Sequence, residues 1–302
     1  MIAGIRLKLP ATSANIGPGF DALGLAMGLE LVVEARVARE FSITATGRDA
    51  DVVGDLARNL MLETYQALMP AGPALKLRVS NGIPLGMGCG SSAAALLSGV
   101  MLANWFGMLE MPEEAEVLEA CVREGHPDNV AACFYGGMTA SSMRDGRVSA
   151  ATVGLDGKAA RWRLLLVLPM LGLATKVARG LLPEIYNRAD VVQNIQATAL
   201  LMAAFSEGRP DLLEEGTRDR VHQPYRMGVC PLLERLLPLV GTAGIWSVTL
   251  SGAGPAVLLI CDPAGDLGEV FGVVRGAAGQ NVEILETRMA GGASVEVMKE
   301  RA

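Results

Sequence analysis

The chain has 302 residues, 51% of them hydrophobic, which is enough for two domains or for one large domain with a sizeable core. Its formal net charge is −6 and it contains no basic run, so we expect no binding to nucleic acid. The five widely spaced cysteines fit neither a zinc site nor a disulfide framework, and they indicate reduced thiols and a cytoplasmic location.

The first half of the chain predicts a mixture of strands and helices. Alternation of apolar and polar residues predicts strands over 4–14, 29–37, 41–47, 74–80, 138–143 and 147–153. Helical spacing and start signals predict helices over 57–69, 92–108 and 112–124. No charge occurs between Arg78 and Glu110, but Pro84 and several glycines interrupt this stretch. We therefore expect a buried helix there and no membrane span.

The second half continues the mixture. We expect strands over 161–169, 245–250, 257–262, 281–289 and 293–299, and helices over 189–208, 230–241 and 267–277, the second of them bent or ended by Pro238. The irregular order of elements predicts an α+β fold rather than a regular parallel winding. A polar, weakly patterned region near 145–160 predicts a boundary between domains 1–152 and 153–302.

A glycine-rich segment lies between a predicted strand and a predicted helix. It reads "PLGMGCGSS" and consists of Pro84, Leu85, Gly86, Met87, Gly88, Cys89, Gly90, Ser91 and Ser92. Backbone N–H groups in such a loop, together with the positive end of the helix dipole, can bind phosphate. The hydroxyl groups of the two serines can bind phosphate or magnesium.

Three interpretations of this loop can be compared: a Walker loop, a dinucleotide-binding loop and a structural turn. A Walker loop needs a lysine after its last glycine, and no lysine occurs between Lys76 and Lys158. Gly88, Gly90 and Ala93 fit a dinucleotide fingerprint, but that fingerprint follows its strand directly, whereas "NGIPLG" intervenes here. The loop on its own therefore indicates either a phosphate site or a structural turn before a tightly packed helix.

Three other polar clusters are candidates for chemistry. Residues 10–24 carry Asn15 and Asp21 in a glycine–proline bend after the first strand, and residues 250–256 form a second glycine turn. Residues 124–130 bring four polar side chains together: Glu124, His126, Asp128 and Asn129. Each cluster by itself also fits a structural role, because turns and helix caps use the same residue types.

Taken together, these clusters resemble the GHMP kinases, a superfamily of small-molecule kinases, and by motif the homoserine kinase family within it. The resemblance rests on "PATSANIGPGFDALGLA", "PLGMGCGSSAAA", "EGHPDNVAACFYGG", "ATKVAR", "DRVHQPYR" and "LSGAGPAVLL", which follow in the family's order between residues 8 and 261. The family loop usually has arginine where Met87 stands and often leucine where Cys89 stands, and "GVCP" after Arg226 also differs. Neither loop change removes a backbone donor.

The resemblance implies a fold and a reaction. The fold would be that of the GHMP kinases, with an N-terminal ATP-binding domain similar to domain 2 of ribosomal protein S5 and a C-terminal ferredoxin-like domain. The reaction would be transfer of the γ-phosphate of ATP, with Mg²⁺, to the side-chain hydroxyl of L-homoserine in threonine biosynthesis. Other GHMP kinases, for example one acting on threonine, and a non-catalytic sensor on the same fold are the alternatives. A homodimer is also implied.

The resemblance also implies roles for individual residues. The glycine loop would hold ATP, and Ser92 and Glu124 would hold the metal. The predicted substrate-binding residues are Asn15, Asp21, His126, Asp128, Arg179, Arg226 and Gly252, with the two arginines gripping the carboxylate and the two aspartates the ammonium. The predicted catalytic set is Asn15, Asp128, Asn129 and Thr175. We expect Asp128 to bind substrate rather than to act as a general base.

Overall fold

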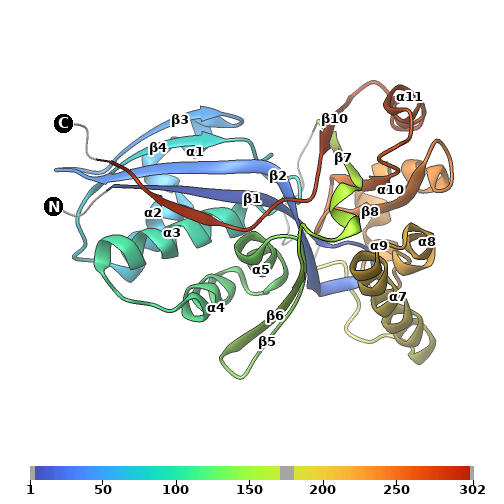
Figure 1. Ribbon diagram of the computed structural model, residues 1–302, viewed down its shortest axis with the longest axis horizontal. Helices are drawn as coiled ribbons and strands as arrows, with labels where there is room; N and C mark the ends of the chain where they lie inside the picture. Colours follow the sequence, from blue (N-terminus) through green and yellow to red (C-terminus); the bar gives the residue numbers. More distant parts are fainter. Residues whose placement is uncertain (1–3, 171–179, 300–302) are drawn as a thin grey trace.

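The computed structural model describes residues 4–170 and 180–299 (Figure 1). In these residues the chain forms two β-sheets with helices packed against them, one sheet of seven strands and one of four. The predicted α+β fold is therefore confirmed.

The larger sheet contains the strands of the first half of the chain and one strand from its end. Its strands are β1 (Ile5–Asn15), β2 (Gly19–Val37), β3 (Ser42–Gly47), β4 (Leu75–Asn81), β5 (Met138–Arg144), β6 (Arg147–Val153) and β11 (Ser294–Val297). The order is β11-β1-β2-β4-β3, and β5 pairs with both β2 and β6. Only β3 and β4 pair in parallel, and the chain between them contains α1 and α2.

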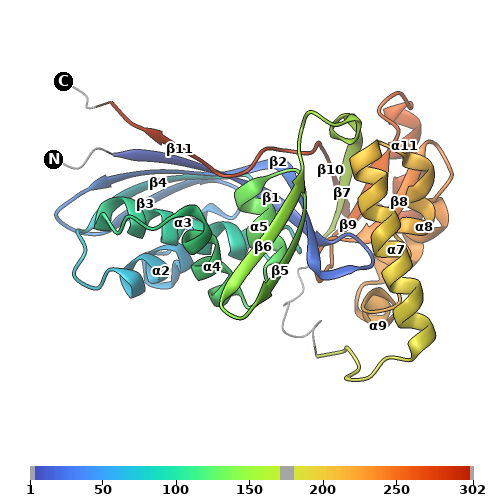
Figure 2. The same cartoon turned by 60° about the horizontal axis from the view of Figure 1, so that its bottom comes forward.

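Helices cover one face of this larger sheet. They are α1 (Ala50–Val53), α2 (Leu60–Leu68), α3 (Ser91–Gly107), α4 (Glu113–Glu124) and α5 (Asp128–Tyr135), and Figure 2 shows α2, α3, α4 and α5 together on the same side. Strand β4 shows the reason, because Leu75, Leu77 and Val79 are buried while Lys76 and Arg78 between them are exposed. Alternate side chains of a strand point to opposite faces, so the uncovered face is polar.

The smaller sheet is antiparallel and has helices on both faces. Its order is β10 (Val282–Thr287), β7 (Arg163–Pro169), β9 (Val257–Cys261) and β8 (Ile245–Leu250). Leu164 and Leu166 of β7 belong to the same buried cluster as Phe205 of the long helix, while Leu165 and Val167 pack in a second cluster. The helices of this half are α7 (Arg188–Glu207), α8 (Leu213–Gly216), α9 (Gln223–Arg226), α10 (Pro231–Leu236) and α11 (Leu267–Ala278).

Most of the predicted elements are present, and the differences lie near the polar clusters. Strand β2 begins at Gly19, ten residues before the predicted start, so the predicted bend is confined to Ile16–Pro18 and Asp21 lies on a strand. Helix α5 was not predicted, because its eight residues begin inside the polar cluster, at Asp128, where the sequence also fits a turn or cap. The predicted helix over 230–241 ends at Leu236, and a short 3-10 turn containing Pro238 follows it.

The uncharged stretch between Arg78 and Glu110 contains α3, most of whose residues are buried under the larger sheet. Across 4–170 and 180–299, no helix combines the length and the apolar character that a bilayer crossing requires.

Candidate functional site

The glycine loop connects β4 to α3 and is held in place from both sides. The backbone N–H of Thr12 on β1 donates to the carbonyl of Cys89 at 3.0 Å, and that of Ala256 donates to the carbonyl of Met87 at 3.2 Å. The hydroxyl of Ser251 donates to the carbonyl of Gly88 at 2.8 Å. The loop is thus clamped between β1 and the turn that joins β8 to β9.

Two of its glycines have no room for a side chain. Gly88 has a φ of +78°, and a Cβ there would lie 2.1 Å from the carbonyl oxygen of Ser251. Gly90, with a φ of +69°, precedes the first residue of α3, and its Cβ would lie 1.9 Å from Oγ1 of Thr12. Glycine is needed at both positions because the backbone is left-handed and its neighbours are in contact.

The start of α3 faces the end of α4. Helix α3 opens with Ser91 and Ser92, and its first N–H groups lack partners within the helix. The hydroxyl of Ser92 donates to Oε1 of Glu124 at 2.7 Å. Glu124 is the last residue of α4, which ends because Gly125 adopts a left-handed conformation. A hydroxyl and a carboxylate are hard oxygen ligands of the kind that Mg²⁺ prefers.

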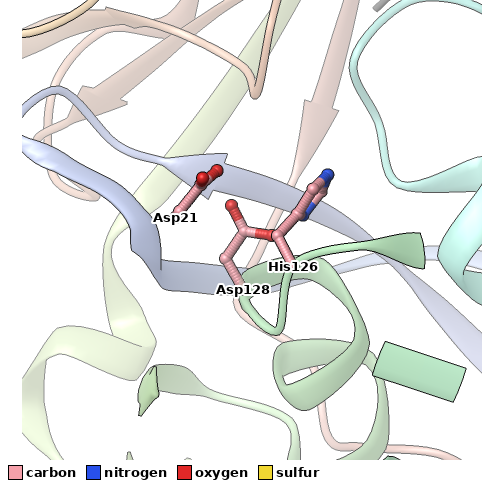
Figure 3. Close-up of side chains that lie close together, drawn as sticks. All are labelled: Asp21, His126 and Asp128. Carbon is pink, nitrogen blue, oxygen red and sulfur yellow. The ribbon is translucent and has the colours of Figure 1, made fainter. Parts of the chain in front are cut away.

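Asp21, His126 and Asp128 meet beside this pair (Figure 3). Asp21 comes from β2, His126 from the link between α4 and α5, and Asp128 from the first turn of α5. One potential ligand atom from each lies within 4.8 Å of the others. Two carboxylates at this separation form a strongly negative site that suits an ammonium group or a metal cation.

The carboxylate of Asp128 is engaged by two neighbours. Its Oδ1 lies 2.5 Å from Nδ1 of His126 and accepts the backbone N–H of Asn129 at 2.7 Å. Burial lowers the pKa of His126, but the hydrogen bond to Asp128 and the negative charges of Asp128, Glu124 and Asp21 outweigh it, so that pKa ends above its usual value. At neutral pH this histidine therefore holds a proton more readily than an exposed one.

The bend between β1 and β2 brings Asn15 to the turn between β8 and β9. Its side-chain NH₂ donates to the carbonyl of Gly252 at 2.9 Å, and its Oδ1 accepts the N–H of Asp21 at 3.1 Å. Asn15, Ile16 and Asp21 all have positive φ. Such backbone is costly for residues other than glycine and is concentrated at functional sites. Asn15 thus links the two sheets at the point where the polar side chains gather.

Arg226 also lines the pocket and is buried, with 1% of its surface exposed. It is the last residue of α9, and its guanidinium carbon lies 5.5 Å from the centre of the Phe20 ring. Its Nη1 approaches Nδ1 of His222 at 2.9 Å and the carbonyl of Gly252 at 3.4 Å. A buried guanidinium is a strong and directional partner for a carboxylate.

One pocket contains most of the predicted site residues. Its lining includes Asn15, Asp21, Gly86, Gly88, Cys89, Gly90, Ser91, Ser92, Glu124, His126, Asp128, Asn129, Arg226 and Gly252. Burial raises the pKa of the Cys89 thiol to about 12, so this side chain is a neutral part of the wall. Phe20 also lines the pocket, and no sequence pattern singled it out.

The other predicted residues lie elsewhere. Pro84 is buried, Met87 packs against the core, and neither lines this pocket. Leu85 lines a second, more apolar pocket, which shares Ser91 and Ser92 with the first. Thr175 and Arg179 lie outside the described residues.

The second pocket also borders the N-terminus of α3. Its apolar walls come from α1, α2 and the chain that leads into the glycine loop: Val52, Val53, Leu60, Met61, Ile83 and Leu85. Both pockets share the two serines, so both border the start of α3.

Comparison with known proteins identifies the family. The family models described as GHMP kinases N terminal domain and GHMP kinases C terminal match residues 55–137 and 201–279. Homoserine kinase of Solibacter usitatus is 43% identical over 260 residues, 84% of each chain, and that of Desulfitobacterium hafniense is 37% identical over 85% of this chain and 86% of its own. The structure of homoserine kinase from Cytophaga hutchinsonii, 22% identical, covers 98% of both chains with a TM-score of 0.79 and shows the same fold. This chain is therefore a member of the homoserine kinase family of the GHMP kinases.

Proposed function

We propose that this chain transfers the γ-phosphate of ATP to the side-chain hydroxyl of L-homoserine, giving O-phospho-L-homoserine for threonine biosynthesis. The proposal rests on family membership and on one structural observation. A glycine loop at a helix N-terminus opens into the same pocket as a pair of carboxylates and a buried arginine. Those are the complements of a triphosphate, an ammonium and a carboxylate.

The nucleotide would lie across the start of α3. Backbone N–H groups of the loop from Gly86 to Ser92 would bind the phosphates, and the helix dipole would add to their attraction. The adenine would occupy the apolar pocket beside Leu85, because a flat aromatic ring gains most from burial against Val52, Leu60 and similar side chains.

Ser92 and Glu124 would hold magnesium. The fit is supported by their oxygen atoms, which lie 2.7 Å apart, and by the place of both residues in the lining of one pocket. When bound, magnesium would neutralise phosphate charge, which a lysine does in a Walker loop. The hydrogen bond between the two side chains must open for both oxygens to face a cation.

The amino-acid substrate would lie between the carboxylate pair and Arg226. The ammonium would bind Asp21 and Asp128, and the carboxylate would bind Arg226 together with Arg179. Asn15, His126 and Asn129 would orient the hydroxyl, with Thr175 near the γ-phosphate and the Gly252 turn closing over the substrate. Charge-assisted hydrogen bonds of this kind each contribute about 1.5–3 kcal/mol.

A dedicated general base is not required in this proposal. Oδ1 of Asp128 already accepts from Asn129 and contacts His126, so this carboxylate is occupied by positioning and by the ammonium. Phosphoryl transfer passes through a loose transition state in which the attacking hydroxyl needs little deprotonation, so its proton passes to the transferred phosphate or to solvent as ADP leaves. Alignment of the hydroxyl with the γ-phosphate therefore supplies most of the rate.

A substrate panel tests the proposal. ADP release should be measured with L-homoserine, L-threonine, shikimate and mevalonate at equal concentrations, with and without Mg²⁺. We expect the highest kcat/KM with homoserine. A preference for threonine would make the chain a kinase of another amino acid, and calorimetric binding of ligand without any turnover would make it a sensor.

We also propose that residues 1–152 and 153–302 form two domains, that the protein is a cytoplasmic homodimer, and that substrates meet between the domains. The separation of β1–β6 from β7–β10 supports the boundary, while β11 returns from the second range to pair with β1 in the larger sheet. The five buried, unpaired cysteines fit a reducing compartment. Analytical ultracentrifugation measures the oligomeric state.

A further inference from the structure

His222 is a fully buried histidine behind the substrate pocket, and it contacts no residue in the carboxylate cluster by hydrogen bond. It precedes α9 and is one of only two histidines in the chain. Its ring lies 5.6 Å from that of Phe20, which lines the pocket.

The two ring nitrogens of His222 have partners that fix the proton. Nε2 lies 2.7 Å from the carbonyl oxygen of Gly17, and a carbonyl can only accept, so Nε2 carries the hydrogen. Nδ1 lies 2.9 Å from Nη1 of Arg226, and a guanidinium can only donate, so Nδ1 is the bare acceptor. The ring is therefore a neutral imidazole with its proton on Nε2.

The charged groups around the ring agree with this state. Burial lowers the pKa of His222, the positive charge of Arg226 lowers it further, and the negative charges of Asp219 and Asp21 oppose them without reversing the outcome. Asp219 Oδ2 is 3.4 Å from Nε2, on the side of the ring that carries the proton.

The backbone that carries the ring of His222 is held by hydrogen bonds to Asp219. Asp219 accepts the backbone N–H groups of Val221, His222 and Gln223, and so fixes the chain that leads into α9. Gly17 lies in the bend that directly follows Asn15, the last residue of β1. His222 therefore joins the β1–β2 bend to the guanidinium of Arg226, two parts of the pocket that are more than 200 residues apart in the sequence.

We infer that His222 is a positioning residue that holds the guanidinium of Arg226 in the orientation that receives the substrate carboxylate, and that the neutral Nε2–H tautomer is essential to this role. The inference rests on the proposed substrate-binding role of Arg226. Nη1 has two acceptors on the protein side, His222 and Gly252, so the rotation of the planar guanidinium is set before substrate arrives.

Two conservative variants separate the two hydrogen bonds. His222→Asn keeps an acceptor near the position of Nδ1 but loses the donor to Gly17, whereas His222→Gln keeps a donor near Nε2 but loses the acceptor for Arg226. We expect His222→Gln to raise the homoserine KM about tenfold, the effect of one hydrogen bond to a charged group, with little change in the ATP KM. His222→Asn should raise it much less.

A double-mutant cycle tests whether the effect passes through Arg226. In an Arg226→Ala background, His222→Gln should cause no further rise in the homoserine KM. The inference is overturned if both His222 variants raise this KM equally, or if the effect of His222→Gln persists without Arg226. If wild-type enzyme prefers another amino acid, the same cycle is run with that substrate.

Nitrogen NMR of the imidazole rings gives a readout that needs no turnover. With His126→Gln used to assign the spectrum, we expect His222 to stay neutral with its proton on Nε2 from about pH 5 to about pH 8. A proton on Nδ1, or a titration of this ring in that range, would overturn the inference even if homoserine proves to be the substrate. Failure of the homoserine assay alone leaves this spectrum unchanged and counts only against the proposed function.

Discussion

Replacing Gly88 by alanine should open the clamp around the glycine loop. The new Cβ would stand 2.1 Å from the carbonyl oxygen of Ser251, and backbone cannot move aside as a flexible side chain can. Relief of this overlap must separate the loop from the β8–β9 turn. That would break the hydrogen bonds from Ser251 to Gly88 and from Ala256 to Met87.

The magnitude follows from those contacts. Left-handed backbone costs alanine about 1–2 kcal/mol, and each lost hydrogen bond costs about 1 kcal/mol, so Gly88→Ala should lower the free energy of unfolding by about 3 kcal/mol. Gly86 is a matched control, because its φ is +66° and a Cβ there would meet nothing within 4 Å. Gly86→Ala should therefore cost only about 1 kcal/mol.

Urea denaturation of the two variants and the wild type measures these differences. Gly88→Ala should in addition raise the homoserine KM, because the displaced turn carries Gly252, which accepts from Asn15. Equal losses of stability in the two variants would refute the reasoning, since they would show that left-handed backbone alone, and not the contact with Ser251, determines the cost.

Three further predictions concern the charged groups. Glu124→Gln should reduce turnover and weaken the dependence of turnover on Mg²⁺, whereas Glu119→Gln on the exposed face of α4 should change neither. If Glu124→Gln responds to magnesium as the wild type does, Glu124 is not a metal ligand. Arg179→Ala should raise the homoserine KM at least tenfold, through loss of a charged hydrogen bond worth about 1.5–3 kcal/mol, and an unchanged KM would contradict the assignment. The pKa of His126 is raised above its ordinary 6.5, so its pairing with Asp128 should stabilise the fold fully below about pH 6.5 and lose that contribution as pH rises through the raised pKa. Urea denaturation of wild type and His126→Gln at several pH values measures this contribution. A difference in stability between the two proteins that does not change with pH would exclude it.

The amino-acid sequence predicted the helices and strands of this fold better than the segments that connect them. Strand β4 and helix α4 were predictable because each has a clear hydrophobic period, and α4 also has Pro112 before it and Gly125 after it. Helix α3 was predictable for another reason, since it is a long apolar stretch without proline that follows the glycine loop. The beginning of β2 was not, because "GFDALGLA" has the composition of a turn and becomes a strand only by pairing with β1 and β5.

In the candidate site too, local sequence patterns predicted individual residues but not the contacts between them. Ser92, Glu124 and Asp128 could be named from local clusters, since polar residues gathered around glycine indicate a loop with chemistry. The contacts that assemble the site join distant segments, such as Asn15 with Gly252, and no local pattern predicts them. His222 was overlooked as a participant because its role depends on two partners, Gly17 and Arg226, that only the folded chain brings together.

Strand β11 determines when the larger sheet can be completed during synthesis of the chain. It pairs with β1, so β1 has an unpaired edge during synthesis until residues 294–297 have been made. Unpaired strand edges invite association with other chains. A nascent or truncated chain that ends after β10 would therefore display the N–H and C=O groups of Ile5–Lys8, and the larger sheet can be completed only after residues 294–297 have been synthesised.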